Sequence, residues 1–263
     1  MEWVEGSEVA RGATAVVTRG AFGRVVKTIN DEVPLIAAQL EAVGTAAAHH
    51  AGLPSPAFRG IDEGPPARLF MDFVEGVPLG QLLPTLGPAF IGEELARCQG
   101  LVRGAHVSPG EGVMSVASLI DYQIDAGPLA SAVKEHMKRE LQELPAGSAF
   151  CHMDLHPLNI LWDGARSTII DWMNARLGPA AADVARTRVI LQSLPHYIGT
   201  DPATLRVVAT LTSGFEATTR QTSPLLWEES DAWLRVLRAA RLDENPPAGE
   251  RAALFSALEL TTG

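Results

Sequence analysis

The spacing of apolar residues changes near residue 75, and this change restricts the possible fold more than any other feature of the sequence. Before it, short apolar runs at residues 9–10, 15–18 and 24–29 are separated by turn-forming stretches that contain glycine. Such runs are typical of an antiparallel β-meander. The first part of the chain is therefore predicted to be a small sheet, with one more strand at residues 68–74.

One helix is predicted between these strands. Asp31 is a candidate N-cap, with Pro34 in the first turn, and Gly44 weakens the helical pattern further along. The spacing of the larger side chains predicts a mostly apolar face made of Leu35, Ile36, Gln39, Leu40 and Val43.

The rest of the chain is predicted to be mainly helical. Helical spacing of apolar residues is clear at Val133, Met137, Leu141 and Leu144. Helical patterns also dominate from about residue 183 onward, with breaks at Pro195, Pro202, Pro224 and Pro246–Pro247. Strands followed by helices predict an α+β fold with a small lobe at residues 1–75 and a helical lobe at residues 76–263.

Composition excludes several classes of protein. The formal net charge of −10 argues against a nucleic-acid partner, because phosphate binding needs a basic surface. No apolar run reaches the roughly 20 residues that a membrane-spanning helix needs, and no secretion signal is recognisable, so we expect no membrane association and a cytoplasmic location. The two cysteines, Cys98 and Cys151, predict buried thiols rather than a disulfide framework. The sequence does not indicate an oligomeric state.

The segment at residues 150–172 places several polar side chains around two apolar runs. The runs and the turn-forming residues between them predict a β-hairpin. If Leu161 lies opposite Ile169, then Asn159 lies opposite Asp171, with their Cβ atoms about 5 Å apart. An amide oxygen and a carboxylate would then meet at the open end of the hairpin, where they could bind a cation.

One Asn and one Asp, with room for water and phosphate, suit Mg²⁺ better than Zn²⁺. Magnesium with so few protein ligands usually implies a phosphorylated nucleotide. Asp154 lies five residues before Asn159, in a segment that Pro157 keeps from being helical, so it can lie beside the metal without binding it. The pattern H-x-D-x-x-x-x-N, followed by a hairpin and then Asp171, matches the arrangement that kinases use for phosphoryl transfer.

The strand-rich part carries candidates for phosphate binding. Lys27, on the third predicted strand, can reach the α- and β-phosphates of a nucleotide. Glu41 on the following helix is favoured over Glu32 as its partner. Gly12 and Thr14 lie at the turn between the first two strands, where backbone amides could approach phosphates.

These residues resemble those of the aminoglycoside phosphotransferase and choline kinase-like family, which are small-molecule kinases with a protein-kinase-like fold. The resemblance covers most of the chain and is carried by CHMDLHPLNILW, IIDWMNARLG, AAADVART and VVKTI. It implies a two-lobed protein-kinase-like fold, with a nucleotide-binding lobe at residues 1–75 and the catalytic loop, metal site and acceptor site at residues 76–263.

The resemblance also implies roles for single residues. Asp154 would be the catalytic base, and Asn159 and Asp171 would bind Mg²⁺. Lys27 and Glu41 would form the ion pair that positions the phosphates of ATP or GTP. The acceptor would be a hydroxyl group of a small molecule.

Further features follow from the same resemblance. LFMDFVEG resembles the connection between the lobes, where the backbone of Asp72, Phe73 and Val74 would bind adenine. Asp183 resembles the buried aspartate that braces the catalytic loop. The chain departs from the family at Met153, where a glycine commonly precedes the catalytic aspartate, and in keeping only Gly12 at the phosphate turn.

Two other functions remain open. His152, Asp154 and His156 alternate along one segment and could bind the metal ion of a hydrolase that uses water as the nucleophile. A catalytically silent kinase fold that binds a ligand or a protein is the second alternative. The hydrolase hypothesis gives no role to Asn159, Asp171, Lys27 and Glu41.

The identity of the acceptor is open. Clustered acidic residues in the helical part would favour an aminoglycoside or another amine-bearing alcohol, while choline-like, sugar, homoserine-like and macrolide acceptors are alternatives. The acidic candidates are Glu216, Glu228, Glu229, Asp231 and Glu244. Trp172 is expected to pack beside the metal site, and Arg176 is a candidate to neutralise a carboxylate or a phosphate.

Overall fold

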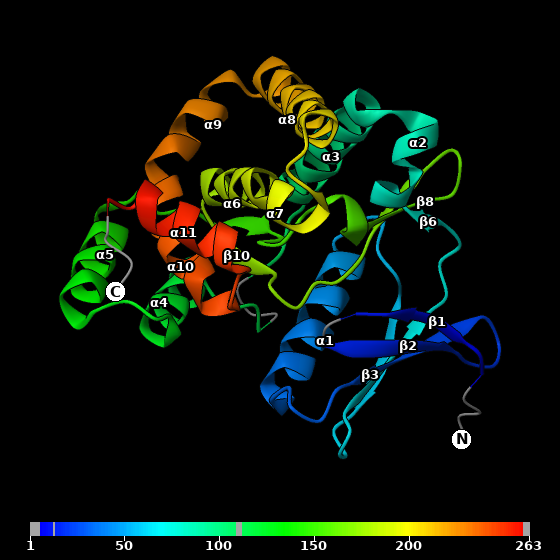
Figure 1. Ribbon diagram of the computed structural model, residues 1–263. Helices are drawn as coiled ribbons and strands as arrows, with labels where there is room; N and C mark the ends of the chain where they lie inside the picture. Colours follow the sequence, from blue (N-terminus) through cyan, green and yellow to red (C-terminus); the bar gives the residue numbers. More distant parts are fainter. Residues whose placement is uncertain (1–5, 13, 109–111, 260–263) are drawn as a thin grey trace.

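The computed structural model describes residues 6–12, 14–108 and 112–259 (Figure 1). Its first part is a five-stranded antiparallel sheet with the strand order β1-β2-β3-β5-β4. The strands are β1 (Glu8–Arg11), β2 (Ala15–Arg19), β3 (Arg24–Ile29), β4 (Phe58–Asp62) and β5 (Arg68–Asp72). The predicted meander is therefore confirmed, whereas the sequence analysis did not find β4 and extended β5 by two residues.

The helix α1 (Leu35–His50) forms between β3 and β4, but the predicted buried face is wrong. Pro34, not Asp31, is the N-cap residue, and Leu35 and Ile36 are 40% and 55% exposed. Small side chains are buried instead: Ala38 and Ala42 pack into the core of the sheet, and Ala47 and Ala48 join the core of the helical part. A helix that approaches two neighbours closely buries small residues, and the spacing of large apolar residues cannot indicate this.

The second part of the chain is mainly helical, which confirms the predicted α+β class. The prolines expected to interrupt helices begin α7, α8 and α9. The helices are α2 (Leu83–Leu86), α3 (Pro88–Gly104), α4 (Val116–Ala126), α5 (Ser131–Glu143), α6 (Ala180–Ser193), α7 (Pro195–Ile198), α8 (Pro202–Thr222), α9 (Pro224–Glu229), α10 (Leu234–Arg241) and α11 (Ala248–Ala257). Within the described residues, the 3-10 helices are η1 (Leu79–Leu82), η3 (Pro157–Asn159), η4 (Ser230–Trp233) and η5 (Leu242–Glu244).

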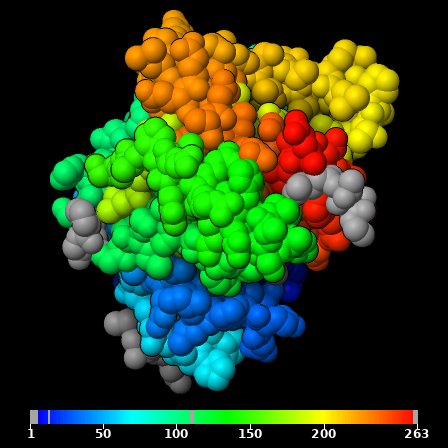
Figure 2. Space-filling view, turned by 90° about the vertical axis from the view of Figure 1, so that its left-hand side faces the viewer, coloured from blue at the N-terminus to red at the C-terminus, as the bar shows by residue number. Residues whose placement is uncertain are grey.

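Two small sheets accompany the helices in the described part of the chain. Strand β7 (Ala149–Cys151) pairs with β10 (Arg176–Gly178), and β8 (Ile160–Trp162) pairs with both β6 (Val77–Pro78) and β9 (Ser167–Ile169). Figure 2 shows the blue and cyan N-terminal part at one end of the molecule and the orange segment that includes α9 at the opposite end. Among the described residues, no helix has both the length and the apolar character needed to cross a membrane.

The helix α1 packs very closely against the segment that follows β9. A Cβ atom added at Gly44 would lie 2.3 Å from the carbonyl oxygen of Trp172 and 3.1 Å from the Cβ atom of Ala175. Only a residue without a side chain permits this approach of the helix backbone. Gly44, which the sequence analysis treated as a weak point of the helix, is thus a contact residue.

We therefore expect Gly44→Ala to lower the free energy of unfolding by about 1–3 kcal/mol, because the added methyl group overpacks the contact. An exposed helical Gly→Ala change normally raises stability by up to about 1 kcal/mol. Gly100 on α3 is the matched control, because an added Cβ there meets no atom within 4 Å. Urea unfolding of both variants checks this; shifts in the same direction would contradict the steric argument.

Candidate active site

Lys27 lies at the centre of the polar residues that the sequence analysis selected. Its Nζ atom donates hydrogen bonds to Glu41 Oε1 at 2.6 Å and to Asp171 Oδ1 at 3.1 Å. The lysine extends from β3, Glu41 from α1, and Asp171 from the segment after β9. The structure therefore brings these three residues together, and it pairs Lys27 with Glu41 as expected.

Electrostatics keeps Lys27 and Asp171 charged, whereas burial raises the pKa of Glu41 to about 7 against the opposing attraction of Lys27. Burial alone would lower the pKa of Lys27, but the attraction of Glu41 and Asp171 raises it above its usual value. Burial acts to raise the pKa of Asp171, and the neighbouring Lys27 ammonium outweighs it, so the pKa of Asp171 lies below its usual range. Asp171 is consequently ionised at neutral pH, as a metal-binding carboxylate must be.

The hairpin before Asp171 forms, but its predicted register is wrong by one residue. Ile160 pairs with Ile169, so the residue opposite Asn159 is Ile170, whose N–H is donated to the Asn159 carbonyl at 3.0 Å. The cause is a turn one residue shorter than expected, in which the Asp163 carboxylate accepts backbone N–H groups at 2.7 and 2.8 Å.

Asp171 nevertheless turns back toward the site. Its φ angle of +65° lies in the left-handed region, and this redirects the chain immediately after the hairpin. Asn159 is buried, and its Nδ2 group donates a hydrogen bond to the carbonyl of Asp154 at 2.9 Å. The Asn159 amide thus ties the Asp154 segment to the hairpin.

Helix α6 holds the segment that contains Asp154. Asp183 Oδ1 accepts the backbone N–H of Met153 at 2.7 Å, and Arg186 Nε donates to the carbonyl of Met153 at 3.1 Å. Arg186 Nη2 also lies 3.5 Å from Asp154 Oδ1. Burial raises the pKa of Asp154, and Arg186 opposes this shift. Asp183 therefore braces the loop as the resemblance implied.

Arg186 is not among the residues that the sequence predicted for the site. The available signal was its position three residues after Asp183 on a helix, which places both side chains on the same face.

Met153 occupies the position before Asp154 where the family commonly has glycine. It adopts φ +60°, a conformation that favours glycine, and its side chain is only 2% exposed. Packing of the methionine offsets the backbone strain.

For this reason we expect glycine to be more stable than alanine at position 153, the reverse of the usual order. Both Met153→Gly and Met153→Ala should be destabilised by loss of the buried side chain, by about 2–5 kcal/mol for alanine. The glycine variant should be the more stable of the two by about 1 kcal/mol, because it alone relieves the strain. Chemical unfolding of the two variants tests this. An alanine variant that is the more stable would show that φ at this position carries no strain.

The histidines do not form the metal cluster of a hydrolase. His152 is fully buried, with Nε2 3.0 Å from the carbonyl oxygen of Ile170, and burial lowers its pKa. His156 Nδ1 accepts the N–H of Leu158 at 3.2 Å. Within residues 6–12, 14–108 and 112–259, no three His, Cys, Asp or Glu side chains are grouped so that they could hold a metal ion.

The two neighbours of the site that the sequence singled out behave differently. Trp172 packs as expected: it is fully buried, stacked on Phe150 with ring centroids 5.4 Å apart. Arg176 donates hydrogen bonds to the carbonyls of Met173 and Ala175 rather than to a carboxylate, and burial lowers its pKa to about 10.

The backbone groups expected to contact a nucleotide are partly used within the protein. The N–H of Asp72 is donated to Ala57 and that of Phe73 to Gly23, at 3.0 and 2.8 Å. These two N–H groups are therefore not free to donate to a ligand. At the predicted phosphate turn, the N–H of Gly12 is donated to Ala15 at 2.9 Å, and the carbonyl of Thr14 accepts the N–H of Asn30 at 2.8 Å. Ala13, in the same turn, lies outside the described residues.

The acidic candidates for acceptor binding do not gather around Asp154. On α8, α9 and η4, Glu216 and Glu228 pair with Arg220, and Asp231 pairs with Arg188. Glu229 on α9 is exposed. Glu244 is the candidate linked to Asp154, through Arg186, and it also pairs with Arg241.

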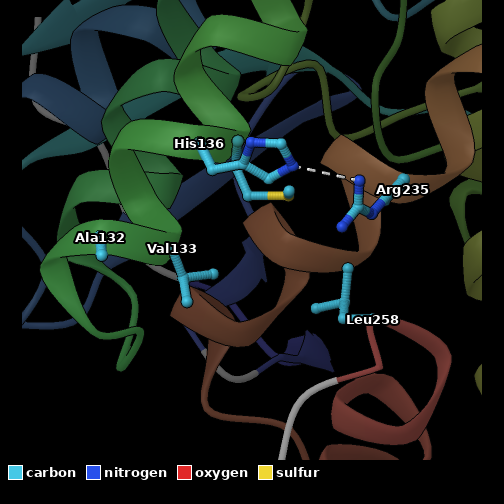
Figure 3. Close-up of a pocket in the computed structure, with 6 residues that line it drawn as sticks. Ala132, Val133, His136, Arg235 and Leu258 are labelled. Carbon is cyan, nitrogen blue, oxygen red and sulfur yellow. Dashed lines mark hydrogen bonds between the residues drawn. The ribbon is translucent and has the colours of Figure 1, made fainter.

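A pocket of about 170 Å³ lies elsewhere on the helical part (Figure 3). Residues of α5 and α10, together with Leu258, line it, and His136 Nε2 lies 3.4 Å from Arg235 Nη1 at its rim. None of the residues that line this pocket belongs to the predicted site.

Several solved structures are similar to the chain, at 11–19% sequence identity. A thermostable mutant of the aminoglycoside phosphotransferase APH(4)-Ia, solved as a ternary complex with AMP-PNP and hygromycin B, has a TM-score of 0.66 at 16% identity over 98% of this chain and 92% of that chain. An aminoglycoside-3'-phosphotransferase of type VIII has a TM-score of 0.63 at 19% identity over 91% and 93%. A choline/ethanolamine kinase family protein from Mesorhizobium loti has a TM-score of 0.53 at 17% identity over 98% and 87%.

These likenesses confirm the two-lobed, protein-kinase-like fold. No curated protein sequence matches the chain significantly. A sequence model of the phosphotransferase enzyme family matches residues 5–225, which is most of the chain. The chain therefore belongs to the phosphotransferase enzyme family and is a small-molecule phosphotransferase, as the resemblance of its motifs predicted.

Proposed function

We propose that the protein transfers the γ-phosphoryl group of ATP or GTP to a hydroxyl group of a small molecule. The observation that carries this proposal is the position of Lys27, 2.6 Å from Glu41 and 3.1 Å from Asp171. This ammonium group joins the N-terminal sheet to the segment after the hairpin. An amine in this position can hold nucleotide phosphates beside a metal-binding carboxylate.

Asn159 and Asp171 would hold Mg²⁺. Asn159 Nδ2 donates to the Asp154 carbonyl, so the amide oxygen of Asn159 faces away from that carbonyl and could bind a cation. The pKa of Asp171 is lowered, so its carboxylate is ionised. Two oxygen donors fit Mg²⁺, which usually keeps several waters and takes further ligands from substrate phosphates. When bound, the ion would offset negative charge on the phosphates.

Asp154 would be the catalytic base. Its side chain is 28% exposed, so an acceptor hydroxyl can reach it, and Asp183 and Asn159 fix the backbone on either side of it. Phosphoryl transfer passes through a loose transition state, so the protein contributes chiefly by positioning groups and stabilising charge. Asp154 would accept a hydrogen bond from the hydroxyl and take its proton late in the reaction.

Adenine would be bound by the segment after β5. With the N–H groups of Asp72 and Phe73 already donated within the protein, the Asp72 carbonyl and the Val74 backbone are the contacts that we propose. Gly12 and Thr14 would lie near the phosphates, since they precede β2, which pairs with the strand that carries Lys27.

An ADP-release screen tests the proposed function. Mg·ATP and Mg·GTP are offered with aminoglycosides, macrolides, amino alcohols and sugars, and each hit is checked by phosphorus NMR for a phosphorylated product. The screen includes neutral as well as amine-bearing alcohols, because the acidic candidates on α8, α9 and η4 are paired with arginines or exposed and so do not favour an amine. Nucleotide binding without any phosphorylated product would favour the silent kinase fold and overturn the proposal.

A further inference from the structure

A row of alternating charges leads away from Asp154 into the helical part. Arg186 on α6 is 3% exposed and lies between Asp154 and Glu244, which belongs to η5. Glu244 in turn contacts Arg241 on α10, and Arg241 Nε donates to Glu250 Oε1 of α11 at 2.9 Å. Four elements of the helical part are thus connected to the proposed catalytic base.

The two carboxylates that flank Arg186 are not equivalent. Nη2 of Arg186 lies 3.5 Å from Asp154 Oδ1, beyond the 2.7–2.9 Å that is usual for a charge-assisted hydrogen bond. The same nitrogen makes a much closer contact with Glu244 Oε1, and Nε is held by the carbonyl of Met153 at 3.1 Å. The guanidinium group is therefore held on two sides, at positions that prevent a full ion pair with Asp154.

This arrangement matters for the proposed chemistry. A guanidinium group forms bidentate pairs with carboxylates, and such a pair would occupy the oxygen atoms that an acceptor hydroxyl needs. Asp154 and Glu244 are the described residues with which Arg186 forms ion pairs. Without the Glu244 carboxylate, the buried charge of Arg186 would be left with Asp154.

We propose that Glu244 and Arg186 are positioning residues: Glu244 holds the Arg186 guanidinium away from Asp154 and so keeps the Asp154 carboxylate open to the acceptor hydroxyl. This inference rests on the proposed role of Asp154 and adds to it. Arg186 still orients the loop through the Met153 carbonyl, while Glu244 sets how closely it approaches the base.

A different role for Glu244 is also testable. Its side chain is 26% exposed, so it could contact an amine of the acceptor directly. In that case its removal would raise KM for the acceptor and leave kcat nearly unchanged. A positioning role would instead lower kcat and leave KM for the acceptor nearly unchanged.

The test compares Glu244→Gln with Glu140→Gln, a matched change in the ion pair between α5 and Arg235 of α10, where the glutamate is exposed to a similar extent (24% against 26%). The first readout is a crystal structure of each variant and of the wild type. In Glu244→Gln we expect Arg186 to close on Asp154 to about 2.8 Å, as in a charge-assisted pair. An Arg186 side chain that stays at its wild-type distance from Asp154 would overturn the proposal.

The second readout is turnover of Mg·ATP, first with water as the nucleophile and then with the strongest acceptor from the screen. Glu244→Gln should lose about 10²-fold in kcat, with KM values within about twofold of the wild type, because a small misplacement of a catalytic group has effects of this size. Glu140→Gln should match the wild type. A raised KM with normal kcat, or normal values of both, would contradict the positioning role.

Glu244→Asp provides the conservative comparison and replaces Glu244→Gln if that variant does not fold. It retains a carboxylate on a shorter side chain, so we expect a smaller loss of kcat and an intermediate distance between Arg186 and Asp154; a loss as large as that of the glutamine variant would contradict the proposal. The crystal structures do not depend on turnover. If no variant and not even the wild type transfers phosphate, the proposed function fails, while the position of Arg186 still decides the positioning proposal.

Discussion

Asp154→Asn is expected to lose about 10²–10⁴-fold in kcat, because proton transfer to a positioned base contributes a factor of this size. Asparagine has nearly the same shape as aspartate but cannot take the proton of an acceptor hydroxyl. Binding of Mg·ATP should be retained, since Asp154 is not one of the proposed metal ligands. Turnover of an acceptor from the screen and calorimetric binding of Mg·AMP-PNP measure the two effects separately.

The structure indicates that this variant will fold. Arg186 keeps its contact with Glu244, so no buried charge is left without a partner, and the Met153 backbone keeps both of its bonds to α6. Asp163→Asn is the matched control: it makes the same chemical change in an exposed turn of the neighbouring hairpin, where asparagine can accept the same backbone N–H groups. Equal kcat values for wild type and Asp154→Asn would remove Asp154 from the mechanism.

The sequence predicted the architecture well because its strongest signals are local. Glycine-bearing turns between short apolar runs defined the first three strands, and prolines marked where α7, α8 and α9 begin. These residues fix backbone angles or remove hydrogen-bond donors wherever they occur, so they can be interpreted without knowledge of the tertiary structure.

The prediction that Asn159 lies opposite Asp171 was based on an incorrect strand register. Apolar alternation cannot decide between turns that differ by one residue, and here the Asp163 side chain stabilises the shorter turn. Asp171 reaches Lys27 through a positive φ angle, which a sequence predicts reliably only for glycine. The resemblance of the motif to known kinases does not depend on this register, and the metal-binding role of the two residues stays a prediction.

The face of α1 and the role of Arg186 depend on long-range packing. Helical spacing of large apolar residues marks a face that packs against one neighbour, whereas α1 lies between two cores and uses alanines and Gly44 to approach both. Arg186 contacts Asp154 and Glu244, which are 32 and 58 positions away along the chain. Its position three residues after Asp183 indicates only the helix face that the two residues share, and the sequence contains no signal for the contact with Glu244.

The second large effect is expected at Asp171, where two substitutions should lower kcat alike but differ in their effect on stability. Replacement by asparagine removes the negative charge that would bind Mg²⁺, and replacement by alanine removes the side-chain oxygen atoms as well. Both variants should lose at least about 10²–10⁴ in kcat, since the metal ion stabilises charge on the transferring group. Lys27 keeps its 2.6 Å contact with Glu41 in either variant, so its buried charge remains paired.

Stability should follow a different order. Asp171 adopts φ +65°, and asparagine tolerates this conformation better than alanine does. Asp171→Asn should therefore unfold close to the wild type, whereas Asp171→Ala should be less stable by about 1 kcal/mol. Magnesium titrations of nucleotide binding and urea unfolding provide the two measurements. A variant that lost turnover only in proportion to its stability, or that kept the wild-type dependence of nucleotide binding on Mg²⁺, would show that Asp171 supports the fold and not the metal.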